Sequence, residues 1–145
     1  MSRTLPAFLA ALALAGVAIS GYLTVTHWGG TPIACAGVGN CEYVNNSPYA
    51  TLGGMPVSAL GGLLYGALAV SAAAWWWRPY DVRLPVLYWG FALAGFGYAG
   101  YLTYVELYVL DAICVWCVTS ASLLTVSLVL ATFALLRPEP ELQTR

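Results

Sequence analysis

The chain has 145 residues, of which 61% are hydrophobic and only 8% charged, and its formal net charge is -1 at pH 7. With a mean hydropathy of +0.78, this composition is too apolar for a water-soluble domain and indicates a membrane protein. Only five basic residues are present, too few for a basic surface that binds nucleic acid. That class of function is excluded.

The apolar residues gather in four uninterrupted runs, each long enough to cross a hydrocarbon core of about 30 Å as a helix. None of the runs holds a charged residue or alternates like a barrel strand, so we predict an all-α membrane protein. The expected fold is a four-transmembrane-helix bundle with spans at about 5–26, 57–77, 84–104 and 113–136. With an outer loop at 27–56 and a frayed cytoplasmic tail at 137–145, residues 1–145 are expected to form a single transmembrane domain.

The first run also has features of a cleaved signal peptide, because Arg3 precedes it and Ala13 and Ala15 resemble a cleavage site. Cleavage after Ala15 would leave an apolar core much shorter than the run, and GVAISGYLTV continues without a polar break. We therefore expect this run to be the first membrane helix.

Small residues recur four positions apart inside three of the spans. Such pairs let helix backbones approach closely where lipid provides no hydrophobic driving force. The pairs are Gly16 with Ser20, Gly62 with Gly66, and Gly95 with Ala99. They predict a compact bundle, although Gly and Ala are also plentiful in this composition.

All five arginines fall on the same side of the predicted membrane, and the sequence has no lysine. They precede the first span, separate the second from the third, or follow the fourth: Arg3, Arg78, Arg83, Arg137 and Arg145. Short positively charged loops stay in the cytoplasm, so both termini are predicted inside and the loops at 27–56 and 105–112 outside. The outer loops hold Glu42, Glu106 and Asp111 but no arginine, in agreement with this orientation.

The four cysteines all fall on the outer side in this topology. Cys35 and Cys41 lie in the long outer loop, and Cys114 and Cys117 form a C-x-x-C motif at the start of the fourth span. Disulfides persist outside the cytoplasm. This confinement to one side indicates thiol chemistry more than packing.

The C-x-x-C motif is expected at a helix start, with Asp111 as the N-cap and Cys114 as the third helical residue. Unpaired backbone N–H groups and the helix dipole favour a thiolate there. Cys117 would lie one turn deeper, less accessible to a protein and closer to a molecule dissolved in the bilayer. The pair is therefore predicted to receive electrons from the aqueous side and release them to a lipid-soluble acceptor.

Other readings of the cysteines are weaker. Five residues separate Cys35 from Cys41, whereas zinc-ligand pairs usually enclose two to four, so no metal is predicted. Val118 after Cys117 excludes covalent haem attachment. Inert structural disulfides remain an alternative, although C-x-x-C closes a loop too short to give much stabilisation. The single histidine, His27, has no evident partner and is expected at the interface.

Four stretches carry a family resemblance: CAGVGNC and EYVNNS after the first span, GGMPVSALGGLLY leading into the second, and CVWC opening the fourth. In this order the chain resembles the vitamin K epoxide reductase family, specifically its bacterial branch, over about residues 35–120. The specific features are the spacing of both cysteine pairs, Ser47 six residues after Cys41, and the spacing of Gly61 and Tyr65. DsbB-type quinone reductases carry their C-x-x-C in the first outer loop, the reverse of the order found here.

The resemblance implies a four-helix bundle around a quinone, with the long outer loop as a lid over the site. By motif position, Cys35 and Cys41 are the shuttle pair, and Cys114 and Cys117 are the quinone-proximal pair. Glycines would give the lid its freedom to move: Gly37, Gly39, Gly53 and Gly54. Candidate quinone-binding positions are Cys117, Ser47, Val57, Tyr65 and Ala121. Ser47 is alternatively an ordinary turn serine before Pro48.

The function implied is that of a membrane thiol oxidoreductase in the bacterial inner membrane, with its cysteines on the periplasmic side. It would re-oxidise a separate thioredoxin-like, DsbA-like protein, because no fused thioredoxin-like domain is expected, and pass two electrons to a membrane quinone. This supports disulfide bond formation. Animal members have asparagine where Val57 stands and tyrosine where Ala121 stands, so ubiquinone or menaquinone is expected rather than vitamin K epoxide.

Thr119 and Ser120 are candidate replacements for the missing polar contacts, although helix hydroxyls often bond only to the backbone four residues back. Two alternative functions remain: a quinone or quinone-epoxide reductase, and a structural membrane protein with inert disulfides. Loss of quinone-dependent thiol oxidation on removal of Cys117 would separate the enzyme from the structural protein.

Overall fold

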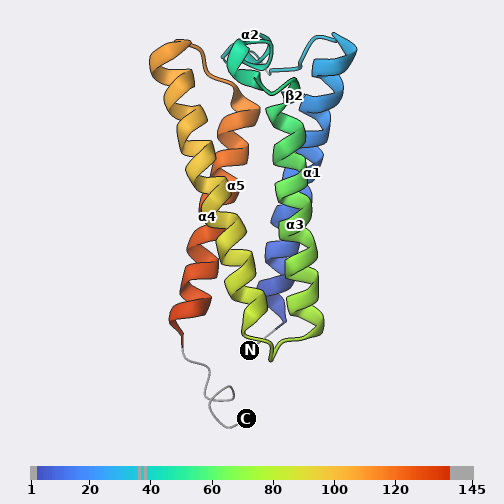
Figure 1. The fold of residues 1–145 in the computed structure, drawn as a ribbon, viewed down its shortest axis with the longest axis vertical. Helices are drawn as coiled ribbons and strands as arrows, with labels where there is room; N and C mark the ends of the chain where they lie inside the picture. The colour runs from blue at the N-terminus through green and yellow to red at the C-terminus, as the bar shows by residue number, and fades with distance from the viewer. Residues whose placement is uncertain (1–2, 36, 38, 138–145) are drawn as a thin grey trace.

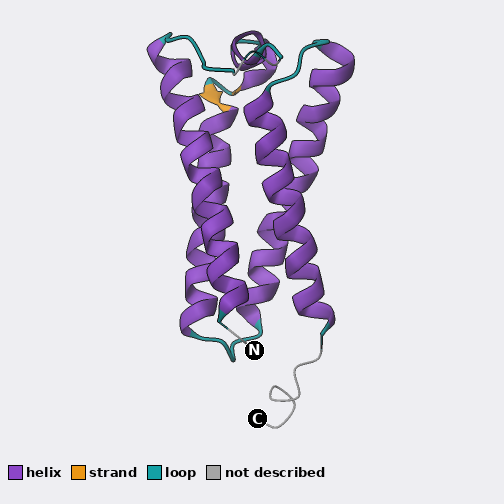
Figure 2. Ribbon diagram, turned by 180° about the vertical axis from the view of Figure 1, so that it is seen from behind, coloured by secondary structure: helices purple, strands orange, loops and turns teal. Residues whose placement is uncertain are grey.

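Four long helices lie side by side in the computed structural model, which describes residues 3–35, 37 and 39–137 (Figure 1). They are α1 (Thr4–Gly29), α3 (Val57–Trp77), α4 (Arg83–Tyr104) and α5 (Val115–Leu136). Short elements gather at one end of the bundle, as Figure 2 also shows from behind. These are α2 (Cys41–Asn45), the 3-10 helix η1 (Pro48–Ala50), strands β1 (Thr51–Leu52) and β2 (Met55–Pro56), and the π-helix η2 (Val105–Val109).

The protein is a helical membrane protein, and three of its described helices are long and apolar enough to span a bilayer: α1, α3 and α5. The fourth long helix, α4, has 22 residues, so its length at about 1.5 Å per residue suffices to span a hydrocarbon core. Its four tyrosines and four glycines make it less apolar than the other three. A membrane crossing by α4 therefore stays a prediction.

Helix α3 begins and ends at the residues expected from hydropathy, whereas α1 extends three residues past its predicted end. It ends where Gly30 adopts a left-handed conformation with φ 63°, which glycine favours because it has no Cβ. The predicted outer loop therefore begins at Gly30 and itself contains α2, η1 and the β1–β2 hairpin.

The two ends of the bundle differ in chemistry (Figure 1). The start of α1, the α3–α4 turn and the end of α5 lie at one end, which therefore holds Arg3, Arg78, Arg83 and Arg137. There the Arg3 guanidinium lies 5.2 Å from the centre of the Trp76 ring, joining α1 to α3. The cysteines lie at the opposite end. Arg145 and the predicted tail, from residue 138 onward, lie outside the described residues.

Small residues let the helices approach closely at two places. A Cβ added at Gly16 of α1 would collide with the Tyr65 ring of α3. A Cβ added at Gly95 of α4 would collide with Leu64 of α3 and also press on Leu124 of α5. The expectation fails at Gly66, where no atom lies within 4 Å of the added Cβ. Small-residue spacing therefore marks contacts at some positions but not at every one.

Candidate redox site

Cys35 and Cys41 form a disulfide in the outer segment, with their Cα atoms 5.9 Å apart. Cys41 is the first residue of α2 and is buried, whereas Cys35 is half-buried. The side chain of Asn40 caps α2 by accepting a hydrogen bond from the Tyr43 N–H at 3.2 Å. Of the two sulfurs, the one at Cys35 is therefore closer to solvent and the one at Cys41 faces inward.

Contacts to α1 and α5 hold the segment that carries this disulfide. The Ala34 N–H donates to the Tyr22 hydroxyl at 3.0 Å, and the Ala34 carbonyl accepts from the Trp116 indole at 2.7 Å. His27, expected to lack a partner, instead donates from Nδ1 to the Asn45 carbonyl at 2.9 Å. Trp116 belongs to the C-x-x-C motif, so the motif itself helps to position the outer disulfide.

A backbone bridge joins the outer segment to the start of the fourth predicted span. Gly39 pairs antiparallel with Cys114, and the Asn40 N–H donates to the Ile113 carbonyl at 2.9 Å. Gly39 has φ 74°, and a Cβ there would collide with the Ile113 carbonyl oxygen. Both its conformation and its surroundings require glycine.

The bridge brings the two cysteine pairs together. Cys41 and Cys114, with exposed fractions of 1% and 0%, belong to one buried cluster with Val44. Cys35 and Cys117 pack against the same cluster. Thiol exchange requires contact between sulfurs, and this cluster brings one cysteine of each pair together.

The predicted start of the fourth helix was wrong. Asp111 does not cap it: this residue has φ 47°, and α5 begins at Val115, with Cys114 as an extended N-cap residue. The helix begins later because residues 113–114 are extended to pair with Gly39. Cys117, rather than Cys114, is the third helical residue.

Glu106 of η2 takes part in this site, which the sequence did not indicate to us. Its side chain is 5% exposed, and its Oε2 accepts the Cys114 N–H at 3.2 Å. The Cys117 thiol has a single proton, which it can donate to this carboxylate or to the Cys114 sulfur. Burial raises the pKa of Glu106 above its ordinary value, while the hydrogen bonds from Cys114 and Cys117 partly oppose the rise. The overlooked signal was a lone acid inside an apolar stretch, VELYV.

Cys114 and Cys117 are free thiols in this structure. The hydrogen bond that Cys117 donates to the Cys114 sulfur lowers the pKa of Cys114, even though burial and the charge of Glu106 act against it. The backbone N–H groups of Trp116 and Cys117 stabilise the same thiolate. Cys114 is therefore the thiolate-forming member of the inner pair.

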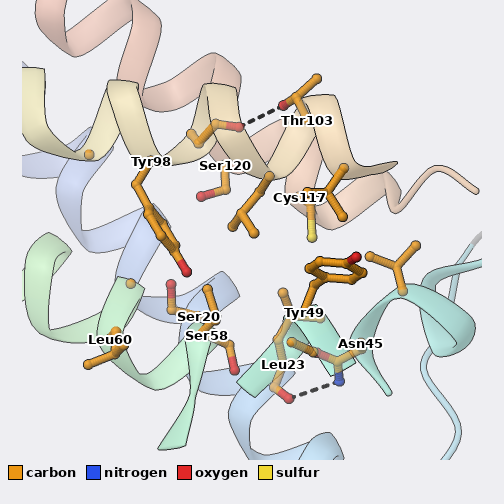
Figure 3. A pocket seen from close by; sticks show the side chains of 18 of the residues that line it. Ser20, Leu23, Asn45, Tyr49, Ser58, Leu60, Tyr98, Thr103, Cys117 and Ser120 are labelled. Carbon is orange, nitrogen blue, oxygen red and sulfur yellow. Dashed lines mark hydrogen bonds between the residues drawn. The ribbon is translucent and has the colours of Figure 1, made fainter. Parts of the chain in front are cut away.

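A cavity of about 400 Å³ occupies the cysteine end of the bundle, a size within the range of small-molecule sites (Figure 3). All four long helices line it, and residues of α2, η1 and β1 also contribute to its wall. The Cys117 sulfur faces this space beside the Tyr49 ring (Figure 3). One member of the inner pair therefore contacts the cavity while the other contacts the outer disulfide.

The cavity wall is mostly apolar with a few polar groups. Tyr65 donates from its hydroxyl to the Ser120 carbonyl at 2.8 Å and shares a second 2.8 Å hydrogen bond with the Ser120 hydroxyl. Ser58 accepts a hydrogen bond from Thr24 at 3.0 Å, and the Tyr98 side chain of α4 points into the same cavity (Figure 3). This combination of an apolar wall and scattered hydroxyls suits an apolar ring that carries polar oxygens.

Most of the residues predicted to bind the cofactor line this cavity: Ser47, Val57, Tyr65 and Cys117. Ala121 does not, because α5 turns Cys117, Ser120 and Leu124 towards the space instead. The Ser47 hydroxyl donates to the Val44 carbonyl at 2.8 Å, which holds the turn after α2. Thr119 is exposed and bonds to the Val115 carbonyl at 2.8 Å, as helix hydroxyls often do.

A model of the vitamin K epoxide reductase family matches residues 7–132. The chain belongs to this family. All four cysteines, Glu106 and every residue that lines the cavity fall inside the matched range. Members are quinone-linked and generally work with a thioredoxin-like partner. Membership therefore makes this protein a membrane redox enzyme of the thiol oxidoreductase or quinone reductase type.

Proposed function

We propose that this protein re-oxidises a separate thioredoxin-like, DsbA-like protein and passes two electrons through its cysteine pairs to a membrane quinone. The observation that carries the proposal is the common burial of Cys41 and Cys114 in one cluster, with Cys117 at the cavity wall. The proposed route runs from a half-buried disulfide, through this cluster, to an apolar cavity. The quinone is a substrate of this reaction and leaves as hydroquinone.

The proposed membrane arrangement is a single domain over residues 1–145, with α4 as the fourth span. The arginine end of the bundle faces the cytoplasm, because positively charged short loops stay there. The cysteine end then faces the periplasm of a bacterial inner membrane, where disulfides persist. Clustering of Arg3, Arg78, Arg83 and Arg137 at one end of the bundle supports this orientation.

The first step is thiol exchange with the partner. A partner thiolate attacks the Cys35 sulfur, because Cys35 is the less buried member of the outer pair. The Cys35–Cys41 bond breaks and a mixed disulfide forms at Cys35. The partner's second thiolate then displaces Cys35, so the partner leaves with a disulfide and the outer pair holds two electrons as a dithiol.

The second step moves these electrons inward. The Cys41 thiolate attacks Cys114 of an oxidised inner pair, which frees Cys117 and joins the two pairs through a Cys41–Cys114 disulfide. Attack by Cys35 on Cys41 then restores the outer disulfide and leaves the inner pair reduced. The structure has this distribution, with a Cys35–Cys41 disulfide and free thiols at Cys114 and Cys117.

The third step returns the inner pair to a disulfide and reduces the quinone, which takes up two electrons and two protons. The apolar cavity beside Cys117 supports a quinone ring there, with hydroxyl groups of Ser58, Tyr98 and Ser120 available to its oxygens. Val57 contributes no polar group, which favours ubiquinone or menaquinone over vitamin K epoxide as substrate.

The test is to mix the purified protein with a reduced thioredoxin-like protein and either ubiquinone or menaquinone, and to follow quinone absorbance. We expect quinone reduction that requires both the partner and the protein. A parallel assay with a quinone epoxide separates the alternative reductase. Absence of partner-dependent reduction with either quinone would contradict the proposal.

A further inference from the structure

Glu106 is the one buried charged side chain among the described residues. An isolated carboxylate is costly to bury, so its burial beside two cysteines points to function. Its partners are the Cys114 backbone and the Cys117 thiol. The reaction described above uses both cysteines but leaves open where their protons go.

We propose that Glu106 is a catalytic acid–base group that accepts the Cys117 thiol proton and delivers it to the quinone as it is reduced. This inference rests on the proposed function and adds a proton path to it. Glu106 and Cys117 line the same cavity, so the carboxylate contacts both the reacting sulfur and the space assigned to the quinone.

The carboxylate is oriented for this role. The Cys114 N–H, 3.2 Å from Oε2, holds it beside the C-x-x-C motif. This donor belongs to the N-cap residue of α5, whose N–H has no acceptor within the helix and is therefore available to Glu106. The Cys117 thiol lies within hydrogen-bonding reach, as proton transfer requires.

Burial also prepares the carboxylate to hold a proton. A glutamate in water is a weak base, and burial raises the pKa of Glu106 above its ordinary value, which makes the carboxylate a better proton acceptor. While Glu106 is ionised, its charge opposes a second negative charge on Cys117. Transfer of the proton removes this repulsion as the thiolate forms, so the two events favour each other.

The step balances as follows. The Cys114 thiolate and the Cys117 thiol lose two electrons to the quinone, and one S–S bond forms between them. The Cys117 proton passes to Glu106 and then to a quinone oxygen, leaving Glu106 ionised again. The other quinone oxygen takes its proton from water. This uptake balances the proton that was released to water when the Cys114 thiolate formed.

The decisive variant is Glu106→Gln, which keeps the shape and an acceptor for the Cys114 N–H but cannot carry the proton. Glu42→Gln is the matched control, because Glu42 is an exposed acid at the same end of the bundle. Each protein is reduced chemically at its cysteines and mixed rapidly with ubiquinone or menaquinone. For Glu106→Gln we expect hydroquinone formation to slow on the order of 100-fold, a typical loss for general acid–base catalysis. Glu42→Gln should match the wild type.

The pH profile separates proton transfer from a structural role. The wild-type rate should rise with pH as Glu106 ionises, with a midpoint above the ordinary glutamate pKa. Glu106→Gln should lack this limb. Other titratable groups around the site are Cys114, Cys117, Tyr49, Tyr65 and Tyr98. All are present in both proteins, so a limb lost only in Glu106→Gln belongs to Glu106.

The outcomes distinguish this inference from the proposed function. If the wild type reduces quinone and Glu106→Gln does so at the same rate with the same pH profile, Glu106 is not the proton carrier. The proposed electron transfer through the cysteine pairs is then unaffected. If the wild type reduces no quinone, the proposed function itself fails. Electron transfer from the partner to the outer pair should be unchanged in Glu106→Gln, and a loss there would identify a folding defect and contradict the assignment.

Discussion

The two cysteine pairs lie at the same end of the bundle but in different surroundings. The outer pair belongs to an irregular segment with positive-φ glycines, and its Cys35 is half-buried. The inner pair stands at the start of a membrane helix, with Cys114 fully buried and Cys117 at the wall of an apolar cavity. In the proposed function, the outer pair reacts with a protein and the inner pair with a lipid-soluble molecule.

The two pairs differ in which of their sulfurs is buried and which one another molecule can reach. Each pair has one sulfur turned away from its substrate, Cys41 in the outer pair and Cys114 in the inner pair, and these two share a buried cluster. In the proposed function, electrons pass inward through this cluster, so the protein partner and the quinone need not contact each other. Changes at the four sulfurs and around them should separate the two half-reactions.

The largest effect is expected from Cys117→Ala. The inner pair can then no longer form its disulfide, so quinone reduction should fall to the uncatalysed background. The outer disulfide should still oxidise about one equivalent of reduced partner and then stop. Partner thiols and quinone absorbance are measured together. Continued turnover would indicate that the inner pair is an inert structural feature.

Cys41→Ser should separate the pairs from each other. Cys35 then has no partner for a disulfide, and nothing attacks Cys114, so partner-driven quinone reduction should also fall close to background. Quinone reduction by a chemically reduced inner pair should proceed at the wild-type rate, because Cys114 and Cys117 are intact. Partner oxidation at the normal rate in this variant would contradict transfer through Cys41.

A smaller effect is expected from Gly39→Ala, which places a Cβ against the Ile113 carbonyl and disturbs the bridge between the pairs. We expect transfer from the outer to the inner pair to slow by about tenfold, equivalent to about 1.4 kcal/mol. Gly37→Ala is the control, since Gly37 has the same φ of 74° but open space around its Cβ position. Equal slowing in both variants would assign the effect to backbone strain alone.

The smallest effect concerns the packing of α1 against α3. Gly16→Ala introduces a Cβ that collides with the Tyr65 ring, and overpacking of this kind costs about 1–3 kcal/mol of stability. Gly21→Ala, with open space at its Cβ, is the control on the same helix. Thermal unfolding in detergent should show a lower midpoint for Gly16→Ala only. Equal midpoints would mean that the α1–α3 contact adapts.

Hydropathy predicted the bounds of a long helix well where no long-range backbone pairing sets them. Helix α3 over Val57–Trp77 has the expected bounds. Hydropathy could not predict the start of α5, because that start depends on pairing between Gly39 and Cys114, which are 75 positions apart in the chain. Local capping rules favoured Asp111, but a long-range backbone bridge determined the conformation instead.

The sequence predicted that all four cysteines lie on one side, but it predicted the residues of the cavity wall less completely. Four of the five residues named with the family resemblance line the cavity, whereas Ala121 does not, because α5 turns Ser120 towards the space instead. Their role in binding a quinone stays a prediction. Glu106 was assigned to an outer loop because it follows the predicted third span. Its surroundings come from η2 at the cavity wall and from the backbone of Ala112 and Cys114, which bonds to Glu106.

The most direct test of transfer between the two cysteine pairs uses the double variant Cys35→Ala/Cys117→Ala, which leaves Cys41 and Cys114 as the only cysteines of the chain. After mild oxidation in detergent, mass spectrometry without reductant identifies the disulfide formed. The account predicts an intramolecular Cys41–Cys114 bond, formed faster than any bond in the matched Cys41→Ala/Cys114→Ala variant. Two persistent thiols, or disulfides only between molecules, would contradict it.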